Sequence, residues 1–326
     1  MSPRVSVIMA VRNGWRHLEE SVSSVLRQRV TDFEFIVVDD GSTDETAQIL
    51  ERFREQDSRM VIVHQGPQGQ TSALNRAAGM ARGEYLARQD ADDVSLPDRF
   101  GCQVRFLDRH PSIAAVGTAA EAIDAEGRII GRVPTFQGPD AVRRGLLRVR
   151  ASLVHGSVMM RREAFEVAGG YREAFRFCQD FDLWLRLAQH VALDNLPEVL
   201  FRWRITPGGV YATQRMAQLQ YGGIGLAFAL ERRRRGTDSY PLLEEAGVDL
   251  DTFAERYHLR RRLYAIWGEL LLRGLNDPAA ARPYLQRAIR HGDVRPKTLC
   301  YFGLALSGRR WLGKPPIQAH PLSGAS

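Results

Sequence analysis

The stretch Tyr85-Leu-Ala-Arg-Gln-Asp-Ala-Asp-Asp93 decides the fold, because an extended run ends there in three carboxylates within four residues. Neighbouring carboxylates repel one another, which raises pKa values unless a cation or solvent offsets the repulsion. No Cys or His stands close by, and hard oxygen ligands favour Mg²⁺ or Mn²⁺ over zinc. A divalent ion at a strand end suggests phosphate chemistry.

The residues before this stretch alternate between short apolar runs and amphipathic segments. Periodicity predicts helices up to about residue 28, from Ser42 or Thr43 as N-cap to residue 53, and over residues 71–81. The apolar runs predict strands over residues 5–11, 33–38, 60–64 and 85–88. Strands separated by helices of this length form βαβ units, so we expect an α/β fold with a mostly parallel sheet and helices on both faces.

Polar residues follow three of these strands, and the carboxyl ends of parallel strands share one edge of a sheet. We therefore expect the pairs Arg12 with Asn13, Asp39 with Asp40, and Asp90 with Asp92 to converge on one crevice.

The remaining chain is less regular. A helix is expected up to about residue 110, a strand over 113–119, a turn over 124–131 and an apolar run over 152–160. The clearest later helices are expected over 221–230, 253–274 and 279–291. We predict a domain over residues 1–210, divided into halves at 95 and 96, and a helical region over 211–326.

The composition is that of a folded protein, with 44% hydrophobic residues in 326. The three cysteines (Cys102, Cys178 and Cys300) lie far apart, which argues against a disulfide framework and favours the cytoplasm. Neither a signal peptide nor a membrane span is expected.

The positive charge is concentrated near the C-terminus, where residues 211–326 carry 18 basic and 10 acidic side chains. Two arginine clusters stand out, at 232–235 and 260–262. Such a region is compatible with peripheral contact with an anionic membrane or a phosphorylated lipid. A solvated arginine-rich face is the simpler alternative, and nucleic acid is not expected.

Five sequence blocks stand in order over about the first 205 residues. They are Val5-Ser-Val-Ile-Met-Ala-Val-Arg-Asn-Gly14, Phe35-Ile-Val-Val-Asp-Asp-Gly-Ser-Thr-Asp44, Gly83-Glu-Tyr-Leu-Ala-Arg-Gln-Asp-Ala-Asp-Asp93, Gly169-Gly-Tyr171 and Gln179-Asp-Phe-Asp-Leu-Trp184. In sequence and spacing, these blocks resemble the inverting GT-A glycosyltransferases of family 2, of the bacterial, non-processive type.

The resemblance implies a nucleotide-sugar donor site and a Mg²⁺ or Mn²⁺ ion. Asp92 corresponds to the metal-binding aspartate of the family's DxD motif, and Asp39 or Asp40 to the residue that reads the base. A turn and helix cap is the alternative for this second pair. Donor contacts are expected from Ala10, Arg12, Asp39, Asp40, Asn75, Asp90 and Arg204.

Asp180 corresponds to the family's catalytic base, which takes the proton of the acceptor hydroxyl. Its alternative role is the N-cap of the helix that follows, and Asp182 is the less favoured base. Gln179 and His155 are expected near the acceptor.

Arg202, Arg204 and the glycines that follow resemble the segment that closes over the donor diphosphate. Relatives often carry a metal-binding histidine close to the position of Arg204, and an arginine cannot ligate a cation. The Gln-x-x-Arg-Trp pattern of processive synthases is missing from the sequence.

The predicted function is the transfer of a sugar from a nucleotide-diphosphate sugar, with UDP favoured, to a carbohydrate or lipid-linked acceptor in surface polysaccharide or glycoconjugate synthesis. The expected location is the cytoplasm, including the inner face of the membrane. Two alternatives are a nucleotidyltransferase acting on sugar phosphates and a non-enzymatic helical scaffold with a vestigial sheet domain.

Overall fold

The computed structural model describes residues 2–149, 152–209, 213–247, 249–250, 252–253, 260–274 and 276–308. The chain divides into two compact units, residues 1–144 with 152–212 and residues 145–151 with 213–326. The predicted helix start at residue 253 adjoins residues 254–259, which lie outside the described ranges, as does residue 211 at the predicted domain boundary.

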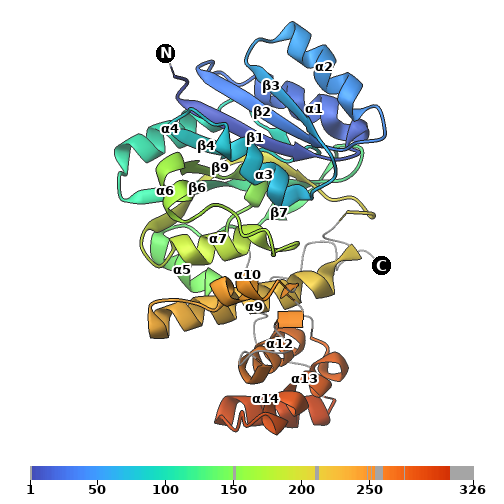
Figure 1. The fold of residues 1–326 in the computed structure, drawn as a ribbon, viewed down its shortest axis with the longest axis vertical. Coiled ribbons are helices and arrows are strands. Elements are labelled where there is room, and N and C mark those ends of the chain that lie inside the picture. Colours follow the sequence, from blue (N-terminus) through green and yellow to red (C-terminus); the bar gives the residue numbers. More distant parts are fainter. Residues whose placement is uncertain are drawn as a thin grey trace. The chain divides into compact units, whose positions relative to one another are not determined.

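The first unit is an α/β structure built on one sheet (Figure 1). Its first half contains β1 (Val5–Val11), α1 (Trp15–Leu26), β2 (Phe33–Asp40), α2 (Thr46–Gln56), β3 (Met60–Gln65), α3 (Gln70–Gly79) and β4 (Tyr85–Arg88). The second half contains β5 (Val94–Ser95), α4 (Arg99–Arg109), β6 (Ile113–Ile123), β7 (Ile129–Val133), α5 (Pro139–Leu146), the 3₁₀ turn η1 (His155–Ser157), β8 (Met159–Arg161), α6 (Arg162–Val167), α7 (Gln179–Leu187) and β9 (Ala192–Arg204).

The strand order is β3-β2-β1-β4-β8-β6-β9-β5, with β7 paired to β6. The strands β3, β2, β1 and β4 are parallel, as predicted. Beyond β4 the sheet is mixed, because β8 runs antiparallel to both β4 and β6, while β9 runs parallel to β6. The sheet therefore combines a parallel half with a mixed half.

Helices cover both faces of the parallel half because both faces of its strands are apolar. The side chains of Val7 and Phe35 belong to a core that includes Leu18 of α1, Leu50 of α2 and Phe100 of α4. Successive side chains of a strand point to opposite faces, and α3 contacts β1 and β2 from the other side. The predicted doubly covered sheet is confirmed.

Strand β9 was not predicted from the sequence. Its pairing with β6 shifts register after Leu196, so that Thr118 opposes Leu196 and Ala119 opposes Val199. Pro197 lies in the skipped stretch, where its missing N–H costs no ladder hydrogen bond. The predicted turn over residues 124–131 is also shorter than expected, since β7 begins at Ile129.

The second unit is helical in its described part. It contains α9 (Arg215–Arg235), α10 (Tyr240–Ala246), α12 (Arg260–Gly274), α13 (Pro278–Arg290) and α14 (Pro296–Leu306). Its core joins α9, α12, α13 and α14 through buried residues that include Leu219, Leu271, Leu285 and Ala305. No helix of the described residues is long and apolar enough to cross a bilayer.

Candidate functional site

The loops after β1 and β2 are joined by side-chain hydrogen bonds. The N–H of Asn13 donates to Ser42 Oγ at 2.9 Å, and the N–H of Thr43 donates to Asn13 Oδ1 at 2.8 Å. The predicted capping of the next helix by Ser42 or Thr43 is wrong, because α2 begins at Thr46 with Glu45 at its N-cap. Arg12 is exposed beside these loops, and Ala10 is buried within β1.

Asp39 and Asp40 are both buried at the end of β2, but their partners differ. Asp40 accepts three hydrogen bonds of 2.8 Å, from Gln65 Nε2 and from the backbone N–H groups of Gln68 and Gly69. It therefore shapes the loop between β3 and α3.

Asp39 accepts hydrogen bonds from the N–H of Ser42 at 3.1 Å and from His64 Nδ1 at 3.0 Å. The other ring nitrogen of His64 lies 3.1 Å from Glu51 Oε1. The hydrogen bonds to Asp39 and Glu51 raise the pKa of His64. Asp39 thus has fewer partners than Asp40, and one of them is a titratable ring.

The acidic loop after β4 contains its own cations. Arg88 is fully buried and donates from Nη2 to Asp90 Oδ1 at 2.5 Å. Arg99, also fully buried, donates to the carbonyl of Arg88 at 2.7 Å, and burial with the neighbouring Arg88 lowers the pKa of Arg99 to about 9. These arginines offset part of the carboxylate repulsion that the sequence alone assigned to a metal ion.

Asp92 and Asp93 have different surroundings. Burial and the neighbouring Asp90 raise the pKa of Asp92 to about 6. No side chain of the described residues donates a hydrogen bond to the Asp92 carboxylate. Asp93 is buried and accepts a hydrogen bond from the N–H of Arg204 at 2.8 Å. Burial and the neighbouring carboxylates raise the pKa of Asp93 well above its ordinary range.

Asp92 is therefore the carboxylate of this loop that fits a cation, because Asp90 and Asp93 are engaged within the protein. The described residues contain no cluster of three or more His, Cys, Asp or Glu side chains arranged to hold a metal. A Mg²⁺ or Mn²⁺ ion bound by Asp92 needs its remaining ligands from diphosphate oxygens and water.

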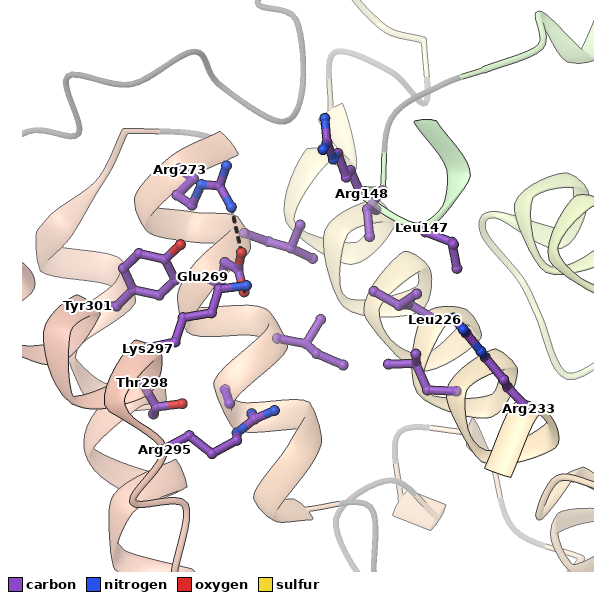
Figure 2. A pocket seen from close by; sticks show the side chains of 15 residues that line it. Leu147, Arg148, Leu226, Arg233, Glu269, Arg273, Arg295, Lys297, Thr298 and Tyr301 are labelled. Atoms are coloured by element: carbon purple, nitrogen blue, oxygen red, sulfur yellow. Dashed lines mark hydrogen bonds and ion pairs between the residues drawn. The ribbon is translucent and has the colours of Figure 1, made fainter. Parts of the chain in front are cut away.

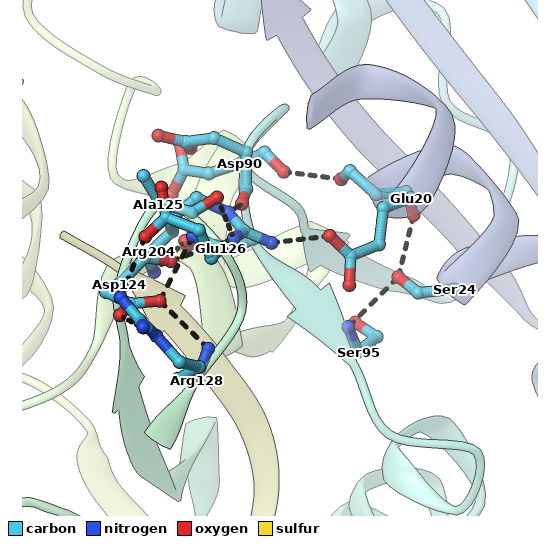
Figure 3. A network of polar contacts seen from close by, with 12 residues as sticks. Glu20, Ser24, Asp90, Ser95, Asp124, Ala125, Glu126, Arg128 and Arg204 are labelled. Carbon is cyan, nitrogen blue, oxygen red and sulfur yellow. Dashed lines mark hydrogen bonds and ion pairs between the residues drawn. The ribbon is translucent and has the colours of Figure 1, made fainter. Parts of the chain in front are cut away.

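Arg204 clamps the acidic loop (Figure 3). Its Nε donates to the carbonyl of Asp92 at 2.7 Å, and Nη1 donates to the carbonyl of Asp124 at 2.9 Å. Its Nη2 lies 2.6 Å from Glu20 Oε2, and only 1% of the Arg204 side chain is exposed. The guanidinium is thus occupied, and its predicted contact with the donor diphosphate stays a prediction.

Gly156 in η1 packs directly against the acidic loop. A Cβ atom at this position would lie 2.8 Å from Asp90 Oδ2 and 2.9 Å from Asp93 Oδ2. It would also lie 2.6 Å from the ring of Phe201. The glycine therefore permits the close approach of η1 to both carboxylates.

His155, next to Gly156, is half-buried and contacts the buried Tyr171. Its Nε2 is 2.9 Å from the Tyr171 hydroxyl. Burial and the nearby Arg88 lower the pKa of His155, while Asp180 and Asp90 oppose that shift. The same two aspartates influence Tyr171, whose pKa is raised by burial. His155 and Tyr171 therefore bring the β4 loop and the start of α7 into electrostatic contact.

Asn75 of α3 holds the neighbouring glycine turn. Its Nδ2 donates to the carbonyl of Tyr171 at 2.8 Å, and its Oδ1 accepts from the N–H of Tyr171 at 2.9 Å. Gly170 adopts φ 66°, which favours glycine. Since both polar atoms of Asn75 are engaged, its observed role is to position Tyr171, and its predicted contact with the donor remains a prediction.

Asp180 is the second residue of α7, whose N-cap is Cys178. The alternative reading of Asp180 as an N-cap is therefore wrong. None of the described residues donates a hydrogen bond to its carboxylate. Asp182 differs, because it is fully buried and lies 2.9 Å from Arg186 Nε.

Gln179 is buried at the start of α7, and its Nε2 donates to Gln70 Oε1 at 3.3 Å. This contact joins α7 to α3.

Four residues that organise the site had been assigned no role from the sequence: Arg88, Arg99, His64 and Tyr171. An arginine within an otherwise apolar strand was the available signal for Arg88, because a buried strand position requires a partner for its charge. His64 carried no such signal, since its contacts depend on the register between β2 and β3.

Comparisons with known proteins agree with this architecture. The family described as Glycosyl transferase family 2 matches residues 6–169. The chain is 36% identical over 208 residues to EpsE of Bacillus subtilis (strain 168), whose name describes it as a glycosyltransferase, covering 62% of this chain and 73% of EpsE. It is 32% identical over 206 residues to the O-antigen biosynthesis glycosyltransferase WbnJ of Escherichia coli, covering 62% and 79%.

Solved structures share the fold. TarS 1–349 of S. aureus in complex with UDP superposes with a TM-score of 0.60 at 17% identity, covering 95% of this chain and 92% of the TarS 1–349 chain. The mannosyltransferase PcManGT of Pyrobaculum calidifontis, in complex with GDP-Man and Mn²⁺, gives a TM-score of 0.58 at 22% identity, covering 97% and 82%.

The sheet and the helices that flank it are those of a GT-A glycosyltransferase. The chain belongs to glycosyltransferase family 2. This membership argues against the nucleotidyltransferase alternative.

Proposed function

We propose that this protein is an inverting glycosyltransferase that moves a sugar from a nucleotide-diphosphate donor to an acceptor hydroxyl in surface polysaccharide or glycoconjugate synthesis. The observation that carries the proposal is Asp180, a carboxylate that receives no hydrogen bond from the described residues and interacts electrostatically with His155 and Tyr171, as Asp90 does. The name of WbnJ, an O-antigen biosynthesis glycosyltransferase, supports the pathway class.

Asp180 is the proposed general base. It takes the proton of the acceptor hydroxyl as the hydroxyl oxygen bonds to the anomeric carbon, while the bond from that carbon to the diphosphate oxygen breaks on the opposite face. Asp180 lies in the first turn of α7. Asp182 is unsuited to this role, because its carboxylate is engaged by Arg186 in the interior.

Asp39 is the proposed reader of the nucleobase, through the N3 proton of uracil. Asp40 already accepts three hydrogen bonds that shape a neighbouring loop, whereas Asp39 accepts two. A UDP-sugar is the favoured donor, and TarS, solved with UDP and with UDP-GlcNAc, supports this choice.

The proposed cofactor is Mg²⁺ or Mn²⁺ held by Asp92. When bound, the ion would neutralise charge on the diphosphate leaving group. Arg88 and Arg204 keep the loop that carries Asp92 in place, and the complex of PcManGT with Mn²⁺ supports a divalent ion.

A donor panel tests the function. Nucleoside diphosphate release is measured for UDP- and GDP-sugars with a carbohydrate or lipid-linked acceptor, with and without Mn²⁺. Release that depends on both donor and acceptor is expected, and the product is expected to have inverted anomeric configuration by NMR. A product with retained configuration would rule out the single-displacement role of Asp180.

The metal site has a test that does not depend on turnover. Calorimetry of donor binding is expected to show a Mn²⁺-dependent gain in affinity that Asp92→Asn removes. Asp98→Asn is the matched control, because Asp98 pairs with Arg29 on the surface. An undiminished gain in Asp92→Asn would contradict the assignment.

A further inference from the structure

The second unit contains a cavity of about 420 Å³ that has no part in the proposed transfer chemistry. Its walls come from α9, α12, the start of α14 and the segment 147–149 (Figure 2). All of these residues belong to the same compact unit, so the cavity is defined within that unit alone.

Among the charged side chains of the lining, positive ones predominate. The lining contains one carboxylate, Glu269, and five cations: Arg148, Arg233, Arg273, Arg295 and Lys297. Glu269 is shared, because its two oxygens lie 2.6 Å from Arg273 Nη1 and 2.8 Å from Lys297 Nζ. A single carboxylate between two cations leaves a net positive charge on this wall.

Two further cations add to this charge. Arg148 and Arg233 are exposed and form no ion pair with the described residues. Arg295 has a partner outside the cavity, since its Nη2 lies 2.6 Å from Asp293 Oδ2. The cavity therefore offers at least two cations, Arg148 and Arg233, without an anionic partner among the described residues.

The beginning of α14 strengthens the same electrostatic preference. Arg295 stands at the N-cap of this 11-residue helix, and Lys297 and Thr298 of its first turn also line the cavity. The N-terminus of a helix carries partial positive charge and attracts phosphate groups.

The side of the cavity formed by α9 carries an apolar surface at Leu226 and Leu230, with Arg233 one helical turn further along. Leu226 and Leu230 lie one helical turn apart on α9, and the complete apolar lining consists of Leu147, Val149, Leu226, Leu230, Ala265, Ile266 and Leu270. In Figure 2, Leu147 and Leu226 lie on the side facing Lys297 and Tyr301. An inorganic anion would leave this wall without a contact, whereas an aliphatic chain would cover it.

We propose that this cavity binds a phosphorylated amphiphile, with the phosphate group among the arginines and Lys297 and the aliphatic part along Leu226 and Leu230. Phosphate is the preferred anion because several cations surround it and arginine binds it in bidentate geometry. A lipid-linked acceptor has this chemistry, so the inference extends the proposed function, although binding depends only on the second unit.

The test is calorimetry on the full chain with three probes: dodecyl phosphate below its critical micelle concentration, inorganic pyrophosphate and dodecyl maltoside. Dodecyl phosphate is expected to bind at least about tenfold more tightly than either other probe, because only it engages both walls. Equal affinity for pyrophosphate would show that the apolar side chains do not contribute to binding. Equal affinity for the maltoside would show that the cations do not contribute. Either result would overturn the proposal.

Matched variants locate the site. Arg233→Glu and Arg148→Glu are expected to weaken dodecyl phosphate binding by about tenfold or more. Arg234→Glu, an exposed neighbour on the same helix that does not line the cavity, is expected to change it less than twofold. An equal loss in Arg234→Glu would mean nonspecific charge attraction and would contradict the assigned position.

Donor binding separates this inference from the proposed function. Arg233→Glu is expected to bind the nucleotide sugar as the unsubstituted protein does, and its melting temperature reports its folding. Loss of dodecyl phosphate binding with donor binding kept therefore tests the cavity itself. A failed donor panel with intact amphiphile binding would count against the transfer function alone.

Discussion

The loop after β4 and the first turn of α7 both carry closely spaced aspartates, but the protein treats them differently. In the β4 loop, Asp90 pairs with buried Arg88, and Asp93 accepts a hydrogen bond from the backbone N–H of Arg204. In α7, Asp182 pairs with Arg186, whereas Asp180 receives no hydrogen bond from the described residues. A dense group of carboxylates can therefore have a structural role or a catalytic one. The hydrogen-bond partners of each carboxylate distinguish the two roles.

The largest effect is expected from Asp180→Asn, which keeps the shape of the side chain and removes the proposed base. The turnover number should fall by about 10³-fold, within the range for loss of a general base. Nucleoside diphosphate release measures this change. Donor affinity by calorimetry should remain within twofold, and turnover at the unsubstituted rate would remove Asp180 from the mechanism.

Asp182→Asn tests the other side of the comparison. It leaves Arg186 buried without its carboxylate, so the free energy of unfolding should fall by about 3 kcal/mol. Urea denaturation measures the loss. Asp180→Asn serves as the control, and comparable stability of the two variants would show that the two carboxylates are not distinguished by their partners.

Arg204→Lys should have a smaller effect, because the charge is kept while the fork of hydrogen bonds is lost. Lysine cannot reach Asp92, Asp124 and Glu20 together, so we expect a loss of about 2 kcal/mol in unfolding free energy. Arg202→Lys is the matched control, since Arg202 is 37% exposed and pairs with Glu121 alone among the described residues. Similar losses in both variants would argue against a clamp at Arg204.

The smallest expected effect is the contribution of His64 to the pH dependence of the free energy of unfolding. Because the pKa of His64 is raised in the folded protein, protonated His64 stabilises the fold fully below its unfolded pKa near 6.5. This contribution disappears as the pH rises through the higher folded value. His64 is 45% exposed, so the effect should stay below about 1 kcal/mol.

His64→Gln should remove this pH dependence. Chemical denaturation at pH 5.5 and pH 8.5 measures it, with His110→Gln as the control, since His110 has no carboxylate partner in the described structure. A His64→Gln protein that keeps the full pH dependence would exclude His64 as its source.

The parallel half of the fold was predictable, because strands buried on both faces appear as continuous apolar runs such as Val5–Val11. The site could be predicted only as a set of strand ends. The order of the elements along the sequence predicts where Asp39, Asp90 and Asp180 lie in the fold. Their hydrogen-bond partners depend on how distant segments pack together, which the sequence order does not predict. Whether Asp39 and Asp180 perform the proposed chemistry stays a prediction.

Two errors have physical explanations. Ser42 and Thr43 have good capping chemistry, yet Asn13 from another loop binds them instead. The long strand β9 escaped detection because Pro197 usually ends a central strand, and here a register shift accommodates it. In both cases a contact distant in sequence outweighed a local preference.

The clamp at Arg204 also limits how far the protein can be shortened. Beyond the clamp, the N–H of Ile205 donates to the carbonyl of Ile123 at 2.8 Å. A fragment ending before residue 204 would lose these contacts and expose the acidic loop to solvent, although it would retain every proposed catalytic residue. A fragment of the sheet unit should therefore extend beyond the last proposed catalytic residue, at least to the end of β9.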